Sequence, residues 1–192
     1  MNLNTSLKCI FITAVLSLNI NAINAHANTQ QWSLTPATHV GFDIKSMGFS
    51  IVKGKFEQVQ SSMSFDLAAP QNASAQFVLN VNSLSLTKPS LRNLILGEDF
   101  FYAEKYQTAT FTSHQFIALG NNHYSIKGDL SLRGVTQPVV LDTLLKPNPT
   151  NPQLMDVEAK TVVKRSDFGM KKAFGGIGEK VNIEVFGQWQ PK

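Results

Sequence analysis

Alternation of apolar and polar residues dominates the chain from Val40 onward and predicts an antiparallel β protein. In HYSIKGDLSLRG, residues 123–134, Tyr124, Ile126 and Leu130 share one face while polar residues occupy the other. Such a period of two is typical of a strand with one buried face and one solvated face. Similar runs predict about nine strands, at 40–45, 51–59, 62–67, 76–82, 107–118, 124–133, 138–146, 154–165 and 180–190.

Short polar segments rich in Gly, Pro and Asn separate these runs. They include GNN at 120–122, RGVTQP at 133–138, KPNPTNPQ at 146–153 and FGGIGEK at 174–180. These residue types favour turns because they tolerate or impose turn dihedral angles. Many short strands with short connections indicate an all-β sandwich or barrel rather than an α/β fold.

One segment, KPSLRNLILGEDFFYAEKY at 88–106, breaks the alternation. It begins with Pro and Ser and places Leu91, Leu94 and Ile95 at helical spacing, with Gly97 as a stop. Aromatic residues follow directly at Phe100, Phe101 and Tyr102. We expect one helix here that closes a barrel end, either as part of the core or as a lid over a ligand.

The first 27 residues differ from the rest of the chain. Lys8 is their only charge, an apolar run follows from Cys9 to Ile20, and small residues stand at Ala25 and Ala27. This pattern predicts a secretory signal peptide that is removed after Ala27, which leaves residues 28–192 as one exported domain. The run is shorter than the roughly 20 apolar residues of a membrane span, so we expect no transmembrane segment.

Charge and motif content narrow the function. The formal net charge is +4, and basic residues gather only at Lys164, Arg165, Lys171 and Lys172, which is less than a nucleic-acid interface usually shows. The sequence contains no histidine pair at metal-ligand spacing, no nucleophile elbow and no phosphate loop. Cys9 is the only cysteine, so the mature domain would form no disulfide and no thiolate metal site. We therefore expect no catalytic residues, no metal and no cofactor.

The apolar faces of the strands limit what a barrel could hold. About eight strands leave an interior that side chains fill or that holds one small ligand. These faces contain almost no hydrogen-bonding groups, so an internal ligand would have to be mostly apolar. Five phenylalanines on them could either fill the lumen or line it: Phe42, Phe56, Phe65, Phe77 and Phe111.

The segment AKTVVKRSDFGM, residues 159–170, places two opposite charges on the less charged face of a strand. Arg165 and Asp167 are two residues apart there, close enough to meet. One interpretation is an ion pair that fixes the strand end before Gly169. The other is that Arg165 anchors a polar ligand head at the barrel mouth through its planar set of donors, with Asp167 orienting it.

Four segments in order resemble the YceI-like family of bacterial periplasmic proteins. They are WSLTPATHVGFDIKSMGFSIVKGKF (32–56), LILGEDFFYAEKYQTATFTS (94–113), IKGDLSLRGVTQPVVL (126–141) and RSDFGM followed by IGEKVNIEV (165–185). The resemblance implies a lipocalin-like eight-stranded antiparallel barrel with one capping helix and a bound isoprenoid or lipid-like chain. Where the family usually has lysine, histidine and methionine, this chain has Lys45, Ser46 and Met47, which puts the lipid class in doubt.

Together, these arguments predict a periplasmic protein that carries or sequesters an isoprenoid or other lipid-like molecule. Two alternatives stay open: a partner of a membrane redox system that handles quinone-like molecules, supported by the basic stretch 164–172, and a stress-related scavenger of lipophilic compounds. The resemblance also favours a homodimer. The expected ligand contacts are Phe42, Ile44, Ser46, Met47, Phe77, Leu79, Leu94, Phe100, Phe101, Phe111, Ile126, Leu130, Arg165, Asp167 and Phe168.

Overall fold

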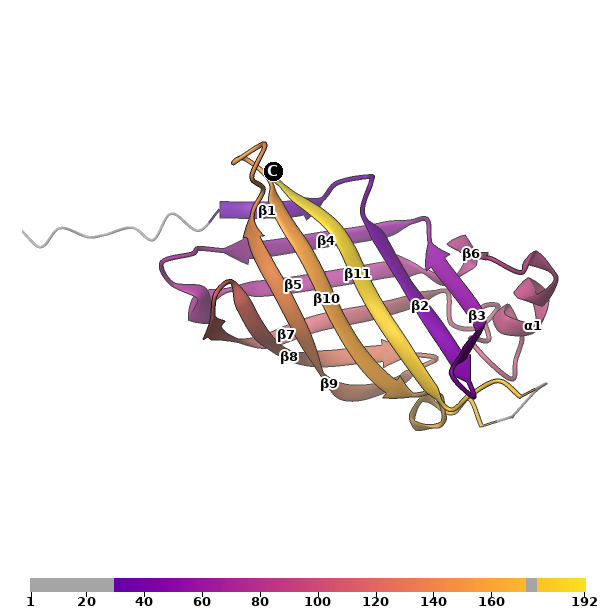
Figure 1. Ribbon diagram of the computed structural model, residues 1–192. Coiled ribbons are helices and arrows are strands. Elements are labelled where there is room, and N and C mark those ends of the chain that lie inside the picture. The colour runs from indigo at the N-terminus through magenta and orange to yellow at the C-terminus, as the bar shows by residue number, and fades with distance from the viewer. Residues whose placement is uncertain (1–29, 172–175) are drawn as a thin grey trace, which may run out of the picture.

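The computed structural model describes residues 30–171 and 176–192 (Figure 1), so the predicted leader lies outside the described residues. Within these ranges the chain forms strands, one short α-helix and several 3-10 turns. The strands are β1 (Gln30–Leu34), β2 (His39–Ser46), β3 (Phe49–Phe56), β4 (Val59–Phe65), β5 (Ser74–Asn80), β6 (Leu84–Leu86), β7 (Thr108–Gly120), β8 (His123–Leu132), β9 (Val135–Pro147), β10 (Met155–Lys164) and β11 (Lys180–Pro191). The helix is α1 (Arg92–Leu96), and the 3-10 turns are η1 (Pro70–Asn72), η2 (Val81–Ser83), η3 (Pro89–Leu91) and η4 (Arg165–Phe168).

Eight of these strands close into an antiparallel barrel, which confirms the predicted all-β, lipocalin-like fold. Their order is β1, β4, β5, β7, β8, β9, β10 and β11, and β11 pairs back to β1. Strands β2, β3 and β6 continue the sheet from β11 beyond this ring. Figure 1 shows β3, β6 and α1 together at one end of the barrel, away from β1.

Strand β11 contributes to both ends of the barrel because it changes its partner at Gly187. Residues 181–186 pair with β2, whereas residues 189–191 pair with β1. Gly187 has φ of 154°, and a Cβ atom there would lie 2.6 Å from the Cα of Thr38. Glycine is required for this close backbone approach. The exchange lets β1 close one end while β2 and β3 extend around the other.

Aromatic side chains fill the end that β1 closes. The ring of Phe65 lies 5.7 Å from that of Tyr124 and 6.3 Å from that of Phe116, measured between centroids. Trp189 is only 2% exposed, and its ring lies 5.6 Å from that of Phe77. Each ring of this kind buries roughly 150–250 Å². This end is therefore a packed core rather than a mouth.

The helical segment is shorter than the alternation break predicted. The 3-10 turn η3 begins at Pro89, α1 covers five residues, and Gly97 is its C-cap as expected. Proline suits the first turn of a helix because its missing N–H would have no partner there. No helix in the described part of the chain is long and apolar enough to cross a membrane.

Candidate ligand-binding site

An apolar cavity of about 110 Å³ lies in the barrel beneath β2, β3 and α1. Ten of the residues predicted to contact a ligand line this cavity, on the four strands β2, β5, β7 and β8, in the segment after α1 and in η4. For those on strands, the alternation identified the inward face. These residues are Phe42, Ile44, Phe77, Leu79, Phe100, Phe101, Phe111, Leu130, Arg165 and Phe168.

Five predicted contacts lie elsewhere. Ser46 ends β2 beyond the cavity, and Met47, in the following turn, is 97% exposed. Leu94 is only half-buried, because α1 directs Ile95 to the cavity instead. Ile126 lies deeper, against the packed end. Asp167 is exposed.

The same alternation could have identified further wall residues on strands whose bounds it already predicted. Val181, Ile183 and Val185 alternate along β11, and Val139 and Leu141 alternate along β9. Gly41, Ala109 and Met170 had no comparable signal, because a small residue or a loop position reveals its facing only in three dimensions. Ile95 did have a signal, the helical spacing of the predicted helix. The other wall residues outside the predicted contact set are Val40, Phe56, Leu132, Thr161 and Val163. Of these, Phe56 was among the phenylalanines expected to fill or line the lumen.

Arg165 is the one charged residue in the described part of the wall, and its side chain is directed to backbone carbonyl groups. It is 3% exposed. Its Nε donates to the carbonyl oxygen of Gly178 at 3.1 Å, and its Nη1 donates to the carbonyl oxygen of Met170. Its Nη2 lies 3.6 Å from Oε2 of Glu179. The guanidinium thus joins the turn after β10 to the residues that precede β11.

The predicted ion pair between Arg165 and Asp167 is wrong. The strand ends at Lys164, and Arg165 already belongs to the 3-10 turn η4. With three residues per turn, side chains two positions apart no longer share a face. Among the described residues, Glu179 is the carboxylate that pairs with Arg165. Hydrogen bonds from Ser166, followed by the nearby Arg165 charge, lower the pKa of Glu179.

Three phenylalanine rings form a roof over the cavity. Phe42 of β2 lies 6.1 Å from Phe56 of β3, and Phe101, after α1, lies 5.9 Å from each of them. Phe56 and Phe101 are only partly buried. The roof is therefore one part of the wall that lies near solvent.

Arg133 connects the segments on two sides of the cavity, a role that the sequence did not indicate. It lies in the turn between β8 and β9, with φ of 52°. Its Nη2 donates to the carbonyl oxygen of Glu98, after α1, and its Nη1 donates to that of Gly169, after η4, both at 2.7 Å. One side chain thus holds the roof segment and the η4 segment together.

The cavity has an aromatic floor. Phe77 and Phe111 lie 6.1 Å apart, and both rings also border a second space of about 20 Å³ on the side of the packed end. Ile126 lines this second space and not the main cavity. The two rings therefore set the depth that a ligand can reach.

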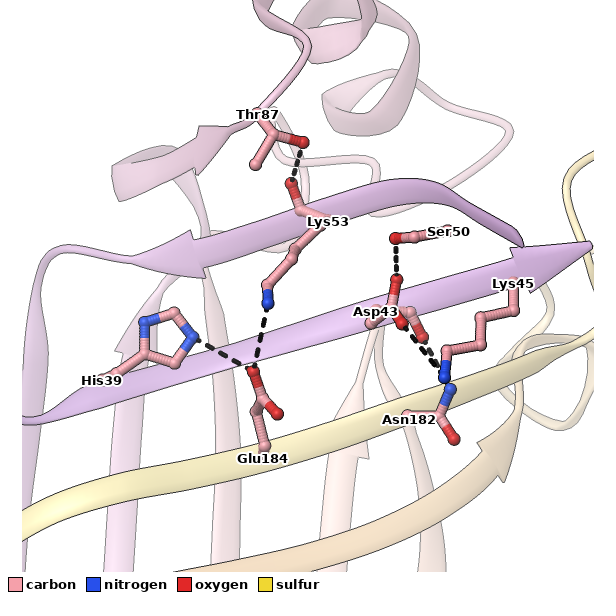
Figure 2. Close-up of polar contacts among 8 residues, drawn as sticks. All are labelled: His39, Asp43, Lys45, Ser50, Lys53, Thr87, Asn182 and Glu184. Atoms are coloured by element: carbon pink, nitrogen blue, oxygen red, sulfur yellow. Dashed lines mark hydrogen bonds and ion pairs between the residues drawn. The ribbon is translucent and has the colours of Figure 1, made fainter. Parts of the chain in front are cut away.

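Polar side chains gather on the outer face of β2, β3 and β11 (Figure 2). Oε1 of Glu184 lies 3.4 Å from Nε2 of His39 and 3.9 Å from Nζ of Lys53. Asp43 accepts a hydrogen bond from Ser50 and lies 3.9 Å from Nζ of Lys45. Among residues 30–171 and 176–192, no group of three or more His, Cys, Asp or Glu side chains could hold a metal ion. The sheet separates these polar contacts from the apolar cavity.

A family model, the YceI-like domain, matches residues 32–188. The chain belongs to the YceI-like family. A UPF0312 protein from Azotobacter vinelandii is 31% identical over 149 residues, which cover 76% of this chain and 78% of the relative. A UPF0312 protein from Vibrio cholerae is 31% identical over 152 residues, with the same two shares.

Solved structures share the fold of this YceI-like chain. Burkholderia cenocepacia BcnA superposes with a TM-score of 0.74 at 24% identity, over 81% of this chain and 98% of BcnA. A polyisoprenoid binding domain from Saccharophagus degradans, implicated in plant cell wall breakdown, gives 0.65 at 17% identity, over 84% and 98%. At these identities the likeness concerns the fold alone.

Proposed function

We propose that the protein binds a long apolar isoprenoid or other lipid-like molecule in the barrel cavity and carries or sequesters it in the periplasm. The observation that carries this proposal is the apolar wall: among the residues that the structure describes, Thr161 and Arg165 are the only ones in it with polar side chains. A lumen of this kind favours an apolar ligand, because a polar one would lose its hydration without replacement. The polyisoprenoid binding domain with the same fold adds support.

Removal of apolar surface from water would drive the binding. Each Å² contributes roughly 25 cal/mol, so a chain of several isoprene units gains several kcal/mol before the entropy of its ordering is subtracted. Arg165 contributes little to a head group in the present arrangement, since its nitrogens already contact Gly178, Met170 and Glu179.

The volume of the cavity adds a condition. About 110 Å³ is well below the roughly 300–1,000 Å³ of ordinary ligand pockets and resembles a cavity for one small ring. A long chain can enter only if side chains move. The Phe42, Phe56 and Phe101 roof is one place where this movement can occur, because two of its rings are only partly buried.

The small volume also favours a second candidate function, the sequestration of compact lipophilic compounds with loose specificity. Such a ligand would fit beneath the roof without large rearrangement. The two candidates differ in the ligand that binds best: a polyprenol in the first case, and small unrelated hydrophobic molecules in the second.

Native mass spectrometry tests the proposal on protein expressed from the full sequence and purified from the bacterial periplasm without detergent. We expect a stoichiometric adduct of polyprenyl or fatty-chain type, identified after solvent extraction, or uptake of added geranylgeraniol. Uptake of naphthalene-sized compounds in place of geranylgeraniol would support the second candidate. Protein that takes up neither would contradict both.

Two matched variants assign the adduct to the cavity. Val163→Trp places a large ring in the wall of the cavity, whereas Val162→Trp makes the same change on the outer face of β10, where Val162 is 57% exposed. We expect Val163→Trp to lose the adduct and Val162→Trp to keep it. Equal adduct in the two variants would place the ligand outside the barrel.

A further inference from the structure

The turn between β2 and β3 exposes two large apolar side chains to solvent. Met47 is 97% exposed and Phe49 is 75% exposed, more than any other large hydrophobic residue in the described part of the chain. The next are Phe186 on β11, which is 63% exposed, and Leu119 near the end of β7, which is 62% exposed. Figure 1 shows the β2–β3 turn at the same end of the barrel as the end of β10 and the start of β11.

The backbone of this turn makes the choice of methionine unusual. Met47 and Gly48 both have positive φ, 48° and 84°, as in the two-residue type I′ turns that favour Asn or Asp followed by Gly. A bulky residue is uncommon in the left-handed region. Because the Met47 side chain is almost fully exposed, packing within the fold does not explain it.

A shift in strand register brings Phe49 to the face of the cavity. Ile44 pairs with Val52, but Lys45 pairs with Ser50. Ser50 donates to Asp43 on the outer face of the sheet (Figure 2). Since successive side chains alternate, Phe49 continues the inward-facing row of Ile44 beyond the rim of the cavity.

Three exposed lysines border this turn across neighbouring strands. Lys164 of β10 lies directly opposite Lys180 of β11, a pairing of like charges that destabilises a sheet. The next pair, Val181 with Ile44, places Lys180 beside Lys45. Within the described residues, neither Lys164 nor Lys180 forms an ion pair.

The acidic groups near these lysines already have other contacts. Asp43 accepts from Ser50 and lies 3.9 Å from Lys45. Glu179 accepts the backbone N–H of Ser166 at 3.1 Å and lies 3.6 Å from Arg165. Lys164 and Lys180 therefore present positive charge that no carboxylate among the described residues pairs with, while Lys45 lies near Asp43.

We propose that this end of the barrel docks on an anionic lipid bilayer. Met47 and Phe49 insert into the headgroup and acyl boundary, and Lys45, Lys164 and Lys180 contact anionic headgroups, the pairing of apolar and basic groups that binds peripheral proteins to membranes. Two side chains on a turn are far smaller than the roughly 800 Å² per partner of a stable protein interface. Lysine is also depleted in protein interfaces, so a bilayer suits this surface better than a protein. Docking would place the cavity rim at the membrane, whatever ligand the cavity holds.

Vesicle flotation tests the docking, with vesicles of equal parts phosphatidylglycerol and phosphatidylcholine. Each protein is purified from the periplasm, and its mass is measured to verify that all preparations have the same N-terminus. We expect the wild-type protein to float with the vesicles and Met47→Ser/Phe49→Ser to bind at least roughly ten-fold more weakly, because the apolar surface of two side chains stays in water. The matched control Leu67→Ser/Leu119→Ser removes two other exposed apolar residues and should bind like the wild type.

Charge substitutions separate the electrostatic contribution. Lys164→Gln/Lys180→Gln should weaken binding and reduce its salt dependence, while Lys127→Gln/Lys146→Gln, at exposed positions on β8 and β9, should not. Wild-type protein that fails to float, or Met47→Ser/Phe49→Ser protein that floats like the wild type, would overturn the proposal. Urea unfolding of each variant checks that it folds, and its cavity adduct is measured separately, so failure of docking is distinguishable from failure of ligand binding.

Discussion

Arg165 is buried at the rim of the cavity and donates to the carbonyl oxygens of Gly178 and Met170. Arg165→Met would remove both donors while keeping an apolar stem in place. Each buried acceptor left without a partner costs on the order of 1–3 kcal/mol. We expect a lower free energy of unfolding by about that amount or more, measured by urea unfolding followed through tryptophan fluorescence.

Asp167→Asn is the matched control for this substitution. Asp167 is exposed and forms no ion pair with Arg165 within the described residues. Its neutralisation should change the free energy of unfolding by less than about 0.5 kcal/mol, as for most surface substitutions. A large decrease in the free energy of unfolding of Asp167→Asn would support the ion pair between Arg165 and Asp167 that the strand pattern predicted.

Glu179 gives this region a dependence on pH. Hydrogen bonds from Ser166, with the charge of Arg165 nearby, hold the pKa of Glu179 below its ordinary value of 4.5. A lowered folded-state pKa means that ionised Glu179 stabilises the protein above pH 4.5 and that this stabilisation is lost as the pH falls through the folded-state pKa. We expect the free energy of unfolding of Glu179→Gln to be lower than that of the wild type at neutral pH. The two values should become equal as the pH falls into the acidic range. A difference that stays constant down to acidic pH would contradict this assignment.

At the level of single residues, alternation predicted facing correctly as long as the strand continued. Thr161 and Val163 line the cavity in agreement with a period of two along β10, and Arg165, the first residue after the strand, still lines it. The prediction failed at Asp167 because the backbone had entered a 3-10 turn. The sequence contains no strong signal for that change, since Gly169, which stops the turn in the left-handed conformation, comes four residues later.

At the level of elements, Arg133 connects two segments that are distant in sequence. Arg133→Ala would remove the hydrogen bonds to Glu98 and Gly169 and leave the barrel strands unchanged. We expect faster amide hydrogen exchange in residues 95–101 and 165–170, because these segments then open locally at lower free energy. Exchange in β7 and β8 should stay at the wild-type rate, and a uniform increase across all strands would show global destabilisation instead.

Element prediction succeeded where a strand was long enough to show its period. Strands β7 to β11 each have ten or more residues, and all were predicted. Strands β1 and β6 were missed. β6 has three residues, and β1 has a single buried side chain, Trp32. Their positions depend on pairing with β3, β4 and β11, and no local pattern encodes such pairing.

At the level of the whole molecule, the sequence could not distinguish a filled barrel from a lined one. Both outcomes occur here. Phe65 is part of the packed end, whereas Phe42, Phe56, Phe77 and Phe111 surround the cavity. The division depends on where β11 exchanges β2 for β1, which is a property of the closed barrel rather than of any one strand.

The aromatic floor should therefore control ligand length. Phe111→Ala would open the main cavity into the smaller space that borders Ile126. Without ligand, we expect a loss of roughly 3–5 kcal/mol in the free energy of unfolding, as for other buried Phe→Ala substitutions. The ratio of geranylgeraniol to farnesol affinity, measured by competition in native mass spectrometry, should rise relative to the wild type, because only the longer chain reaches the added depth. Leu132→Ala, which enlarges the cavity away from the floor, should not raise this ratio. An unchanged ratio in Phe111→Ala would mean that the chain does not extend toward the packed end.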